Sequence, residues 1–330
     1  MIPISVVIIC LNEAANIGAC LHSLTCQDYP VEQVEIIVVD GGSQDGTLEE
    51  VASFQRRWPH VRVEIEPRRG AAIGRNTGLW AARNPYVAFI DADCQAPEGW
   101  LQRLAERFVH HTRNDSQVVA VGGGNIPPDG DHPLEEAIAI ALDSFVGSFN
   151  SPQGRAWDHE REVVSLPTLN VLYDKKRVLE VGGFDITLQS DAEDADLNYR
   201  LRLKGERLIF IPNLAVRHHF RPTLTTWYRN MFRYGRGRAR LLKRHRGMWS
   251  WIYLLPPLFV LGFASMVLAP WWPFFWLPLL YFPCIVIYSG ILCAKRKRLD
   301  RWARVAAIFV IQHFGYGYGQ VYGLLNPSVR

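Results

Sequence analysis

The last third of the chain almost lacks acidic residues. Residues 249–330 contain one acidic residue and seven basic ones, and residues 229–248 contain eight basic residues and no acidic one. Residues 1–228 instead hold 31 acidic and 21 basic residues. The formal charge of +4 therefore hides three regions with different environments. We call them the acidic region (1–228), the basic segment (229–248) and the apolar tail (249–330).

Charge of either sign is absent from Gly247 to Ala294, a run of 48 residues. A membrane-spanning helix needs about 20 apolar residues, so this run predicts spans at about 250–269 and 274–294. A buried hairpin of a soluble core is the alternative. The uncharged stretch at 305–325 is less apolar, and it is expected either to span the membrane or to lie in its interface.

Basic residues flank the apolar run on both sides. The basic segment precedes it, and four consecutive basic residues follow at 295–298. The positive-inside rule places such clusters on the cytoplasmic side. We therefore expect a protein of the cytoplasmic (inner) membrane, with residues 1–228 in the cytoplasm. No basic segment precedes the first apolar run, which argues against a cleavable signal peptide.

Several well-known binding motifs are also missing. The six cysteines lack the spacing of metal or redox sites, and the sequence contains no G-x-G-x-x-G and no G-x-x-x-x-G-K-[ST]. These absences argue against a zinc or redox protein, a dinucleotide-binding protein and a P-loop protein.

Strand and helix patterns alternate over the first 125 residues. Short β-branched runs predict strands at Ile4–Ile9, Val34–Val39, Val61–Ile65, Val87–Ile90 and Val118–Val121. Between them, helical patterns lie at about 16–26, 45–57, 71–82 and 98–111. This order predicts an α/β fold with a mostly parallel sheet and a nucleotide-sized crevice at the carboxyl ends of the strands.

Polar residues follow the first two predicted strands. Asn12 and Glu13 come after the first, and Asp40 and Gly41 come after the second. A carboxylate at this place accepts hydrogen bonds from a base or ribose, and glycine lets the backbone approach a ligand closely. A simple turn is the alternative interpretation of Asp40.

Asp91 and Asp93 end the fourth predicted strand, and strand alternation puts both carboxylates on one side of the chain. Two converging carboxylates suit Mg²⁺ or Mn²⁺, which commonly shares its ligand shell with substrate phosphates. Two solvated turn aspartates are the alternative.

A second acidic group precedes the helical pattern at 197–203. It comprises Asp191, Glu193, Asp194 and Asp196. Carboxylates crowded in a pocket raise one another's pKa, which suits a general base. An acidic first turn favoured by the helix dipole is the alternative.

Taken together, these residues resemble the family 2 glycosyltransferases of GT-A fold. The matching stretches occur in the family's order at 5–13, 38–47, 75–78, 91–93, 182–185 and 193–197. Residues 234–240, followed by apolar helices, are similar more narrowly to the ExoA-like succinoglycan-type membrane glycosyltransferases. The resemblance implies a GT-A nucleotide-diphospho-sugar transferase domain, a mostly parallel sheet with helices on both faces, followed by C-terminal transmembrane helices.

The resemblance also implies roles in binding a UDP-sugar donor. Glu13 and Asp40, with the adjoining Asn12 and Gly41, would hold the uracil and ribose. Arg75 would lie near the nucleotide or its diphosphate.

Asp93 would be the main metal ligand of the DxD motif. Asp91 would lie beside it, near the donor ribose and sugar, and His218 or His219 would be a further ligand.

Asp194 would be the base that deprotonates the acceptor hydroxyl, with Glu193 beside it. The Q-x-x-R-W signature of processive synthases is absent, and only Arg229 and Arg233 stand nearby. These arginines would bind an acceptor or donor diphosphate. Their spacing argues against processive polymer synthesis.

Eight cations within 18 residues are also typical of nucleic-acid binding. Because an apolar run follows at once, attraction to anionic lipid head groups, about 1 kcal/mol per cation, explains the basic segment better. We therefore expect anionic membrane lipids as partners and no nucleic acid.

The sequence thus predicts an inverting, metal-dependent glycosyltransferase that moves a sugar from a UDP-sugar to a saccharide on a polyprenyl diphosphate, for exopolysaccharide or another cell-surface glycan. A polyprenyl-phosphate glycosyltransferase acting on the bare lipid phosphate is one alternative. A catalytically silent membrane scaffold of a glycan assembly complex is another.

Overall fold

The computed structural model describes residues 1–130, 132–148, 151, 157–219 and 223–326. The chain forms two compact units. The first comprises Met1–Asp129 and Asn150–His219, and the second comprises Gly130–Phe149 and Phe220–Arg330. This division differs from the expected boundary at residue 228.

The difference arises mainly from helix α5 (Pro133–Leu142), which belongs to the second unit. Its apolar side, including Ile138 and Ala141, packs in one core with Ile308 and Phe309 of α12 (Trp302–Leu325). The sequence shows no composition change at this point, so the crossing of the chain between units is visible only in the structure.

The first unit contains an eight-stranded sheet in the order β3-β2-β1-β4-β9-β6-β10-β8. The strands are β1 (Ile4–Cys10), β2 (Val34–Asp40), β3 (Val61–Ile65), β4 (Tyr86–Asp91), β6 (Val118–Gly122), β8 (Arg161–Glu162), β9 (Val171–Asp174) and β10 (Arg207–Phe210). The five strands expected from the sequence are confirmed. β9 runs antiparallel to both of its neighbours, and β8 runs antiparallel to β10. The other pairs are parallel.

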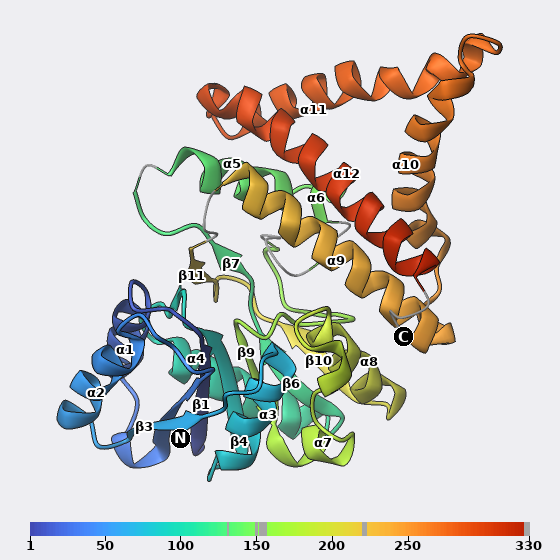
Figure 1. The fold of residues 1–330 in the computed structure, drawn as a ribbon. Helices are drawn as coiled ribbons and strands as arrows, with labels where there is room; N and C mark the ends of the chain where they lie inside the picture. The colour runs from blue at the N-terminus through green and yellow to red at the C-terminus, as the bar shows by residue number, and fades with distance from the viewer. Residues whose placement is uncertain (131, 149–150, 152–156, 220–222, 327–330) are drawn as a thin grey trace. The chain divides into compact units, whose positions relative to one another are not determined.

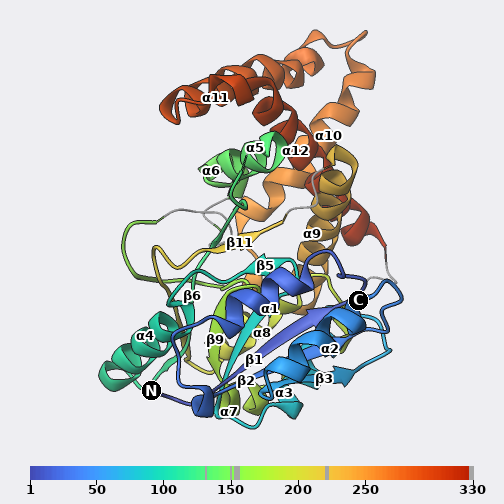
Figure 2. The ribbon, with the colours of Figure 1, turned by 90° about the vertical axis from the view of Figure 1, so that its left-hand side faces the viewer.

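Helices cover both faces of this sheet (Figures 1 and 2). They are α1 (Ile17–Thr25), α2 (Thr47–Arg57) and α4 (Trp100–Asn114) on one face, and α3 (Ala71–Ala81), α7 (Lys175–Glu180) and α8 (Glu193–Leu203) on the other. Along β1, Val6 and Ile8 contribute to the first core and Val7 to the second. This alternation is the period of two that a strand imposes on its side chains, and it explains why the central strands are apolar throughout.

The strand register brings the predicted polar residues to one edge of the sheet. Cys10 at the end of β1 pairs with Asp40 of β2, and Ile9 pairs with Asp91 of β4. The loops after these parallel strands therefore leave the sheet side by side.

A small second sheet, in the order β5-β11-β7, completes the first unit. It consists of β5 (Cys94–Gln95), β7 (Asn125–Ile126) and β11 (Val216–His218). The buried Asn170 side chain fixes the segments that lead into β7 and β11. Its Nδ2 donates to the carbonyl oxygens of Gly124 and Leu214, and its Oδ1 accepts from Trp100 Nε1 at 2.8 Å. These short strands carry no pattern from which the sequence predicts them.

The second unit is helical. It contains α5, α6 (Phe145–Ser148), α9 (Leu224–Arg244), α10 (Leu255–Ala264), α11 (Tyr281–Lys295) and α12. Two stretches are long and apolar enough to cross a membrane, Trp251–Leu268 and Pro273–Lys295, close to the two spans expected from the sequence. The stretch at 305–325 is helical within α12 but, in the described part of the chain, is not among these candidates. Most of the basic segment lies on α9.

Glycines let α9 and α12 approach each other closely. A Cβ atom at Gly319 would overlap the carbonyl oxygen of Phe232, and one at Gly235 would overlap that of Tyr316. Small residues at such a crossing allow two helix backbones to pack directly.

We predict that Gly319→Ala lowers the melting temperature of the full chain in detergent. Alanine is favoured over glycine in a helix by about 1 kcal/mol, so a loss of stability would report the contact with Phe232. Gly262→Ala on α10 is the control, because its new Cβ would meet no atom closer than 4.0 Å. Equal melting temperatures for the two variants would contradict this packing.

Candidate active site

The loops after β1 and β2 are tied together by side-chain hydrogen bonds. The buried Asp40 carboxylate accepts from the backbone N–H groups of Gly42 and Ser43, at 2.9 and 2.8 Å. Ser43 Oγ donates to Asp40 and accepts from the Asn12 N–H, at 2.5 and 2.8 Å. Gly42 has a φ of +88°, which a side chain would strain. Asp40 thus shapes this loop, as the turn interpretation expected.

Glu13 and Gly41 lie at the same edge. The nearly buried Glu13 side chain accepts from Asn16 Nδ2 at 2.8 Å, and its backbone N–H donates to Thr47 Oγ1. The Gly41 N–H donates to the carbonyl oxygen of Cys10. The four residues predicted to bind the nucleotide are therefore neighbours, and their contact with a base or ribose stays a prediction.

Arg75 lies at the centre of the site. It is 5 % exposed, on the inner side of α3, and its guanidinium forms ion pairs with Asp91, at 3.1 Å, and with Glu193. It also lies 5.9 Å from the centre of the Phe184 ring. A buried guanidinium requires paired carboxylates. This interaction joins the end of β4 to the start of α8.

The acidic residues of α8 divide into two kinds. Asp196 is buried and pairs with Arg200 at 2.7 Å, as their spacing of four residues in a helix predicts. Arg200 also donates to the backbone carbonyl oxygens of Val181 and Gly183. These two residues are structural. Asp194 is partly exposed and sits in the first turn of the helix.

Burial raises the pKa of the Glu193 carboxyl to about 7. The Arg75 guanidinium opposes this rise, and the nearby Asp194 charge adds to it. Glu193 is buried and bound to Arg75, whereas Asp194 is partly exposed and accepts from the Ala195 N–H at 2.7 Å.

Asp93 and Asp91 have different neighbours, although they are two residues apart. Asp93 Oδ1 lies 3.5 Å from His218 Nε2 and 3.8 Å from Cys94 Sγ. Carboxylate, thiol and imidazole each offer one atom here, and these atoms lie within 4.8 Å of one another. A carboxylate with an imidazole is a donor set that fits a divalent ion. Asp91 is not in this group.

His219 contacts Asp93 through the backbone: its N–H donates to the carbonyl oxygen of Asp93 at 3.1 Å. Of the two predicted histidines, His218 is the one whose ring nitrogen lies 3.5 Å from the Asp93 carboxylate.

Arg229 and Arg233 lie on α9 in the second unit. Arg229 is exposed, and Arg233 lies over the Tyr234 ring. Their role with a diphosphate stays a prediction.

Sequence reasoning missed two residues of this region. Cys94 was set aside because the cysteines lack metal spacing, although its position next to Asp93 was a usable signal. Asn125 Nδ2 lies 2.8 Å from His218 Nδ1. The sequence carried no signal for this contact, because 93 residues separate the two.

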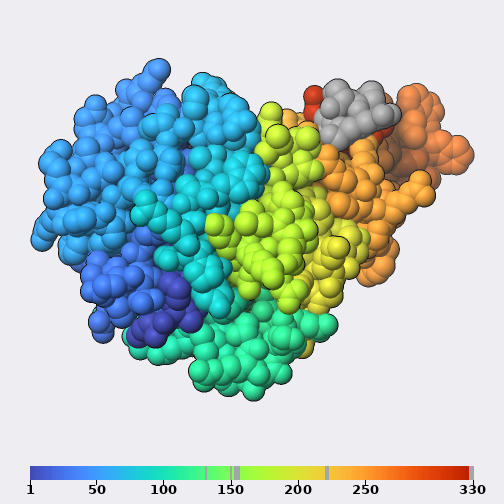
Figure 3. All heavy atoms as spheres, turned by 90° about the horizontal axis from the view of Figure 1, so that it is seen from below, coloured from blue at the N-terminus to red at the C-terminus, as the bar shows by residue number. Residues whose placement is uncertain are grey.

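Helix α3 is bound to the segment that follows α7. The Asn76 Nδ2 donates to the Phe184 carbonyl oxygen, and the Asn76 Oδ1 accepts from the Phe184 N–H. In Figure 3 the yellow-green region of α7 lies directly beside the cyan region of α3.

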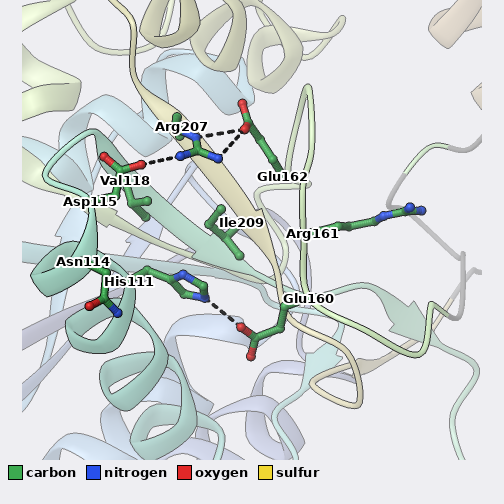
Figure 4. Close-up of a pocket in the computed structure, with 9 residues that line it drawn as sticks. All are labelled: His111, Asn114, Asp115, Val118, Glu160, Arg161, Glu162, Arg207 and Ile209. Carbon is green, nitrogen blue, oxygen red and sulfur yellow. Dashed lines mark hydrogen bonds and ion pairs between the residues drawn. The ribbon is translucent and has the colours of Figure 1, made fainter.

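A separate pocket of about 210 Å³ lies near β8 and β10 and contains none of the predicted site residues. Figure 4 shows Arg207 between Asp115 and Glu162, and His111 directed at Glu160. Arg161, which also lines the pocket, lies over the Trp157 ring.

Comparisons with known proteins agree with this architecture. The family model described as "Glycosyl transferase family 2" matches residues 5–152, and "Glycosyl transferase family group 2" matches residues 86–291. The chain is 30 % identical over 261 residues to glycosyltransferase AglE of Haloferax volcanii, covering 79 % of this chain and 81 % of that protein. It is 32 % identical over 254 residues to succinoglycan biosynthesis protein ExoA of Rhizobium meliloti, covering 76 % and 73 %.

A third relative is the dolichyl N-acetyl-alpha-D-glucosaminyl phosphate 3-beta-D-2,3-diacetamido-2,3-dideoxy-beta-D-glucuronosyltransferase of Methanococcus voltae. It is 22 % identical over 272 residues, covering 81 % of this chain and 80 % of that protein. Among solved structures, mannosyltransferase PcManGT from Pyrobaculum calidifontis, in complex with GDP-Man and Mn²⁺, superposes with a TM-score of 0.59 at 21 % identity, covering 94 % and 87 %. The GT-A fold expected from the sequence is confirmed.

We predict that Arg75→Met lowers the free energy of unfolding by about 3–5 kcal/mol, because it leaves Glu193 buried without its partner. The measurement is denaturant unfolding of the full chain in detergent. The double variant Arg75→Met/Glu193→Gln should recover part of the loss. Lys176→Met is the control: it removes an ion pair with Glu180 in which both side chains are exposed, and should cost less than about 1 kcal/mol. Similar losses for Arg75→Met and Lys176→Met would refute the central role of Arg75.

Proposed function

Because the chain belongs to glycosyltransferase family 2, we propose that it transfers one sugar from a UDP-sugar to a saccharide on a polyprenyl diphosphate, for exopolysaccharide or another cell-surface glycan. The observation that carries this proposal is the buried Arg75 between Asp91 and Glu193. It connects the strand end proposed to hold the donor with the helix start proposed to activate the acceptor.

The donor would lie across the carboxyl ends of β1, β2 and β4. Asn12, Glu13, Asp40 and Gly41 are grouped there, and crevices at this edge of an α/β sheet are usual nucleotide sites. A divalent ion, Mg²⁺ or Mn²⁺, held by Asp93 and His218 would stabilise negative charge on the leaving diphosphate.

The reaction would be a single displacement with inversion. The acceptor hydroxyl oxygen forms a bond to the anomeric carbon, Asp194 takes up the hydroxyl proton, and the bond from that carbon to the diphosphate breaks. Asp194 suits this role because it is partly exposed next to the buried Arg75–Glu193 pair. Glu193 and Arg75 would hold the helix start in position.

The acceptor proposal is supported by the second unit. Two candidate spans and the cations of α9 suit a lipid carrying a diphosphate among anionic head groups. Arg229 and Arg233 would contact that diphosphate. The Methanococcus voltae relative is named for a lipid-linked sugar acceptor, a dolichyl N-acetylglucosaminyl phosphate. Basic residues on both sides of the apolar run favour a cytoplasmic first unit.

We predict that Asp194→Asn lowers the rate of sugar transfer by roughly 10²–10⁴-fold, because the hydroxyl proton loses its acceptor. UDP affinity, measured by calorimetry on the full chain, should stay nearly unchanged. Asp28→Asn, at an exposed position on the same unit, is the matched control. Undiminished turnover in Asp194→Asn would refute the assignment of the base.

The acceptor is tested with membranes that contain the full chain and radiolabelled UDP-sugars. We expect label in lipid when a glycosylated polyprenyl diphosphate is supplied, and none with bare polyprenyl phosphate. Transfer only to the bare phosphate would establish the alternative enzyme. Absence of transfer from any UDP- or GDP-sugar would favour a silent scaffold.

A further inference from the structure

A thiol, a carboxylate and an imidazole meet where β5 and β11 pair. His218 lies opposite Cys94 in this antiparallel pair, and Asp93 directly precedes β5. Each residue offers one ligand atom: a carboxylate oxygen of Asp93, Cys94 Sγ and a ring nitrogen of His218. These three atoms all lie within 4.8 Å of one another. The ligand atoms come from two segments more than 120 residues apart in the sequence, so the fold itself assembles the group.

The chemistry of this group differs from an all-oxygen site. Mg²⁺ and Mn²⁺ prefer carboxylates, carbonyls and water, whereas thiolate and imidazole ligands suit Zn²⁺. The usual order of stability also places Zn²⁺ well above Mn²⁺ for a given nitrogen and sulfur donor set.

We propose that Asp93, Cys94 and His218 form a cation site that, without nucleotide, selects a thiophilic divalent ion of the Zn²⁺ class over Mn²⁺. This inference rests on the proposed function in one respect: it uses Asp93 and His218, which are proposed there to hold a divalent ion. It adds Cys94 as a third ligand. A bound diphosphate would contribute oxygen ligands and favour Mn²⁺. A thiophilic ion is therefore expected to compete with the Mn²⁺–nucleotide complex.

Asn125 acts as the positioning residue for this site. It is 5 % exposed, its Nδ2 lies 2.8 Å from His218 Nδ1, and its buried Oδ1 has no hydrogen-bond partner in the described part of the chain. Turning the amide over exchanges these two atoms. Oδ1 then accepts from Nδ1–H, and the lone pair of Nε2 faces Asp93. An acceptor at the second ring nitrogen is the common arrangement for a metal-bound histidine.

The test must separate Cys94 from the other cysteines. Cys26 and Cys284 are exposed, and Cys26 Sγ lies 3.7 Å from His22 Nδ1. We therefore use the full chain in detergent with Cys26→Ser and Cys284→Ser as the reference protein. Cys20, which is buried and donates to the carbonyl oxygen of Asp91, provides the matched control substitution.

Cd²⁺ is the probe, because a cadmium–thiolate bond has an ultraviolet charge-transfer band. In the reference protein we expect a band that saturates at one ion per chain and is displaced by Zn²⁺ but not by the same concentration of Mn²⁺. Cys94→Ser should abolish the band, and Cys20→Ser should keep it. A band that survives in Cys94→Ser, or that Mn²⁺ displaces as well as Zn²⁺, would overturn the proposal.

Asn125 is tested by the same titration. Asn125→Leu should weaken Cd²⁺ binding by roughly 10–100-fold, as for other residues that orient a ligand, and Asn125→Asp should restore it because a carboxylate also accepts from Nδ1–H. Equal weakening in both variants would refute the positioning role.

Two failures are distinguishable. Sugar transfer by a protein that shows no cadmium band would reject only this inference, and a band without transfer from any nucleotide sugar would reject only the proposed function.

Discussion

The first unit depends on one buried positive charge. Arg75 cannot lie inside the protein without its two carboxylates, so Asp91 and Glu193 must converge on it. This requirement fixes where α8 begins relative to β4. Asp194, the next residue after Glu193, is partly exposed, and Asp93 faces His218 of β11. The carboxylates that bind Arg75 are therefore different from the two that we propose for the chemistry.

The predictable part of this architecture was local. The β-branched runs and the helical spacing predicted the parallel strands and four helices of the first half, because each of these elements carries its own hydrophobic period. The motifs at Asp40 and Asp91 pointed to one edge of the sheet, and the strand register brings them together there. Which N–H groups the Asp40 carboxylate binds within its own loop is visible only in the structure.

What the sequence could not show depends on distant pairing. β9 and β11 are short, and their places follow from the hydrogen bonds of Asn170 and from the register opposite Cys94. The assignment of α5 to the second unit is of the same kind. The segregation of charge along the chain, in contrast, was visible at once and agrees with an acidic α/β unit and a basic, apolar helical unit.

The most direct test of the account is a structure of the full chain with UDP and Mn²⁺. The account predicts the diphosphate and the ion beside Asp93 and His218, and the uracil against the loops that carry Glu13 and Asp40. UDP bound away from the carboxyl ends of β1, β2 and β4, or an ion without Asp93 among its ligands, would contradict it.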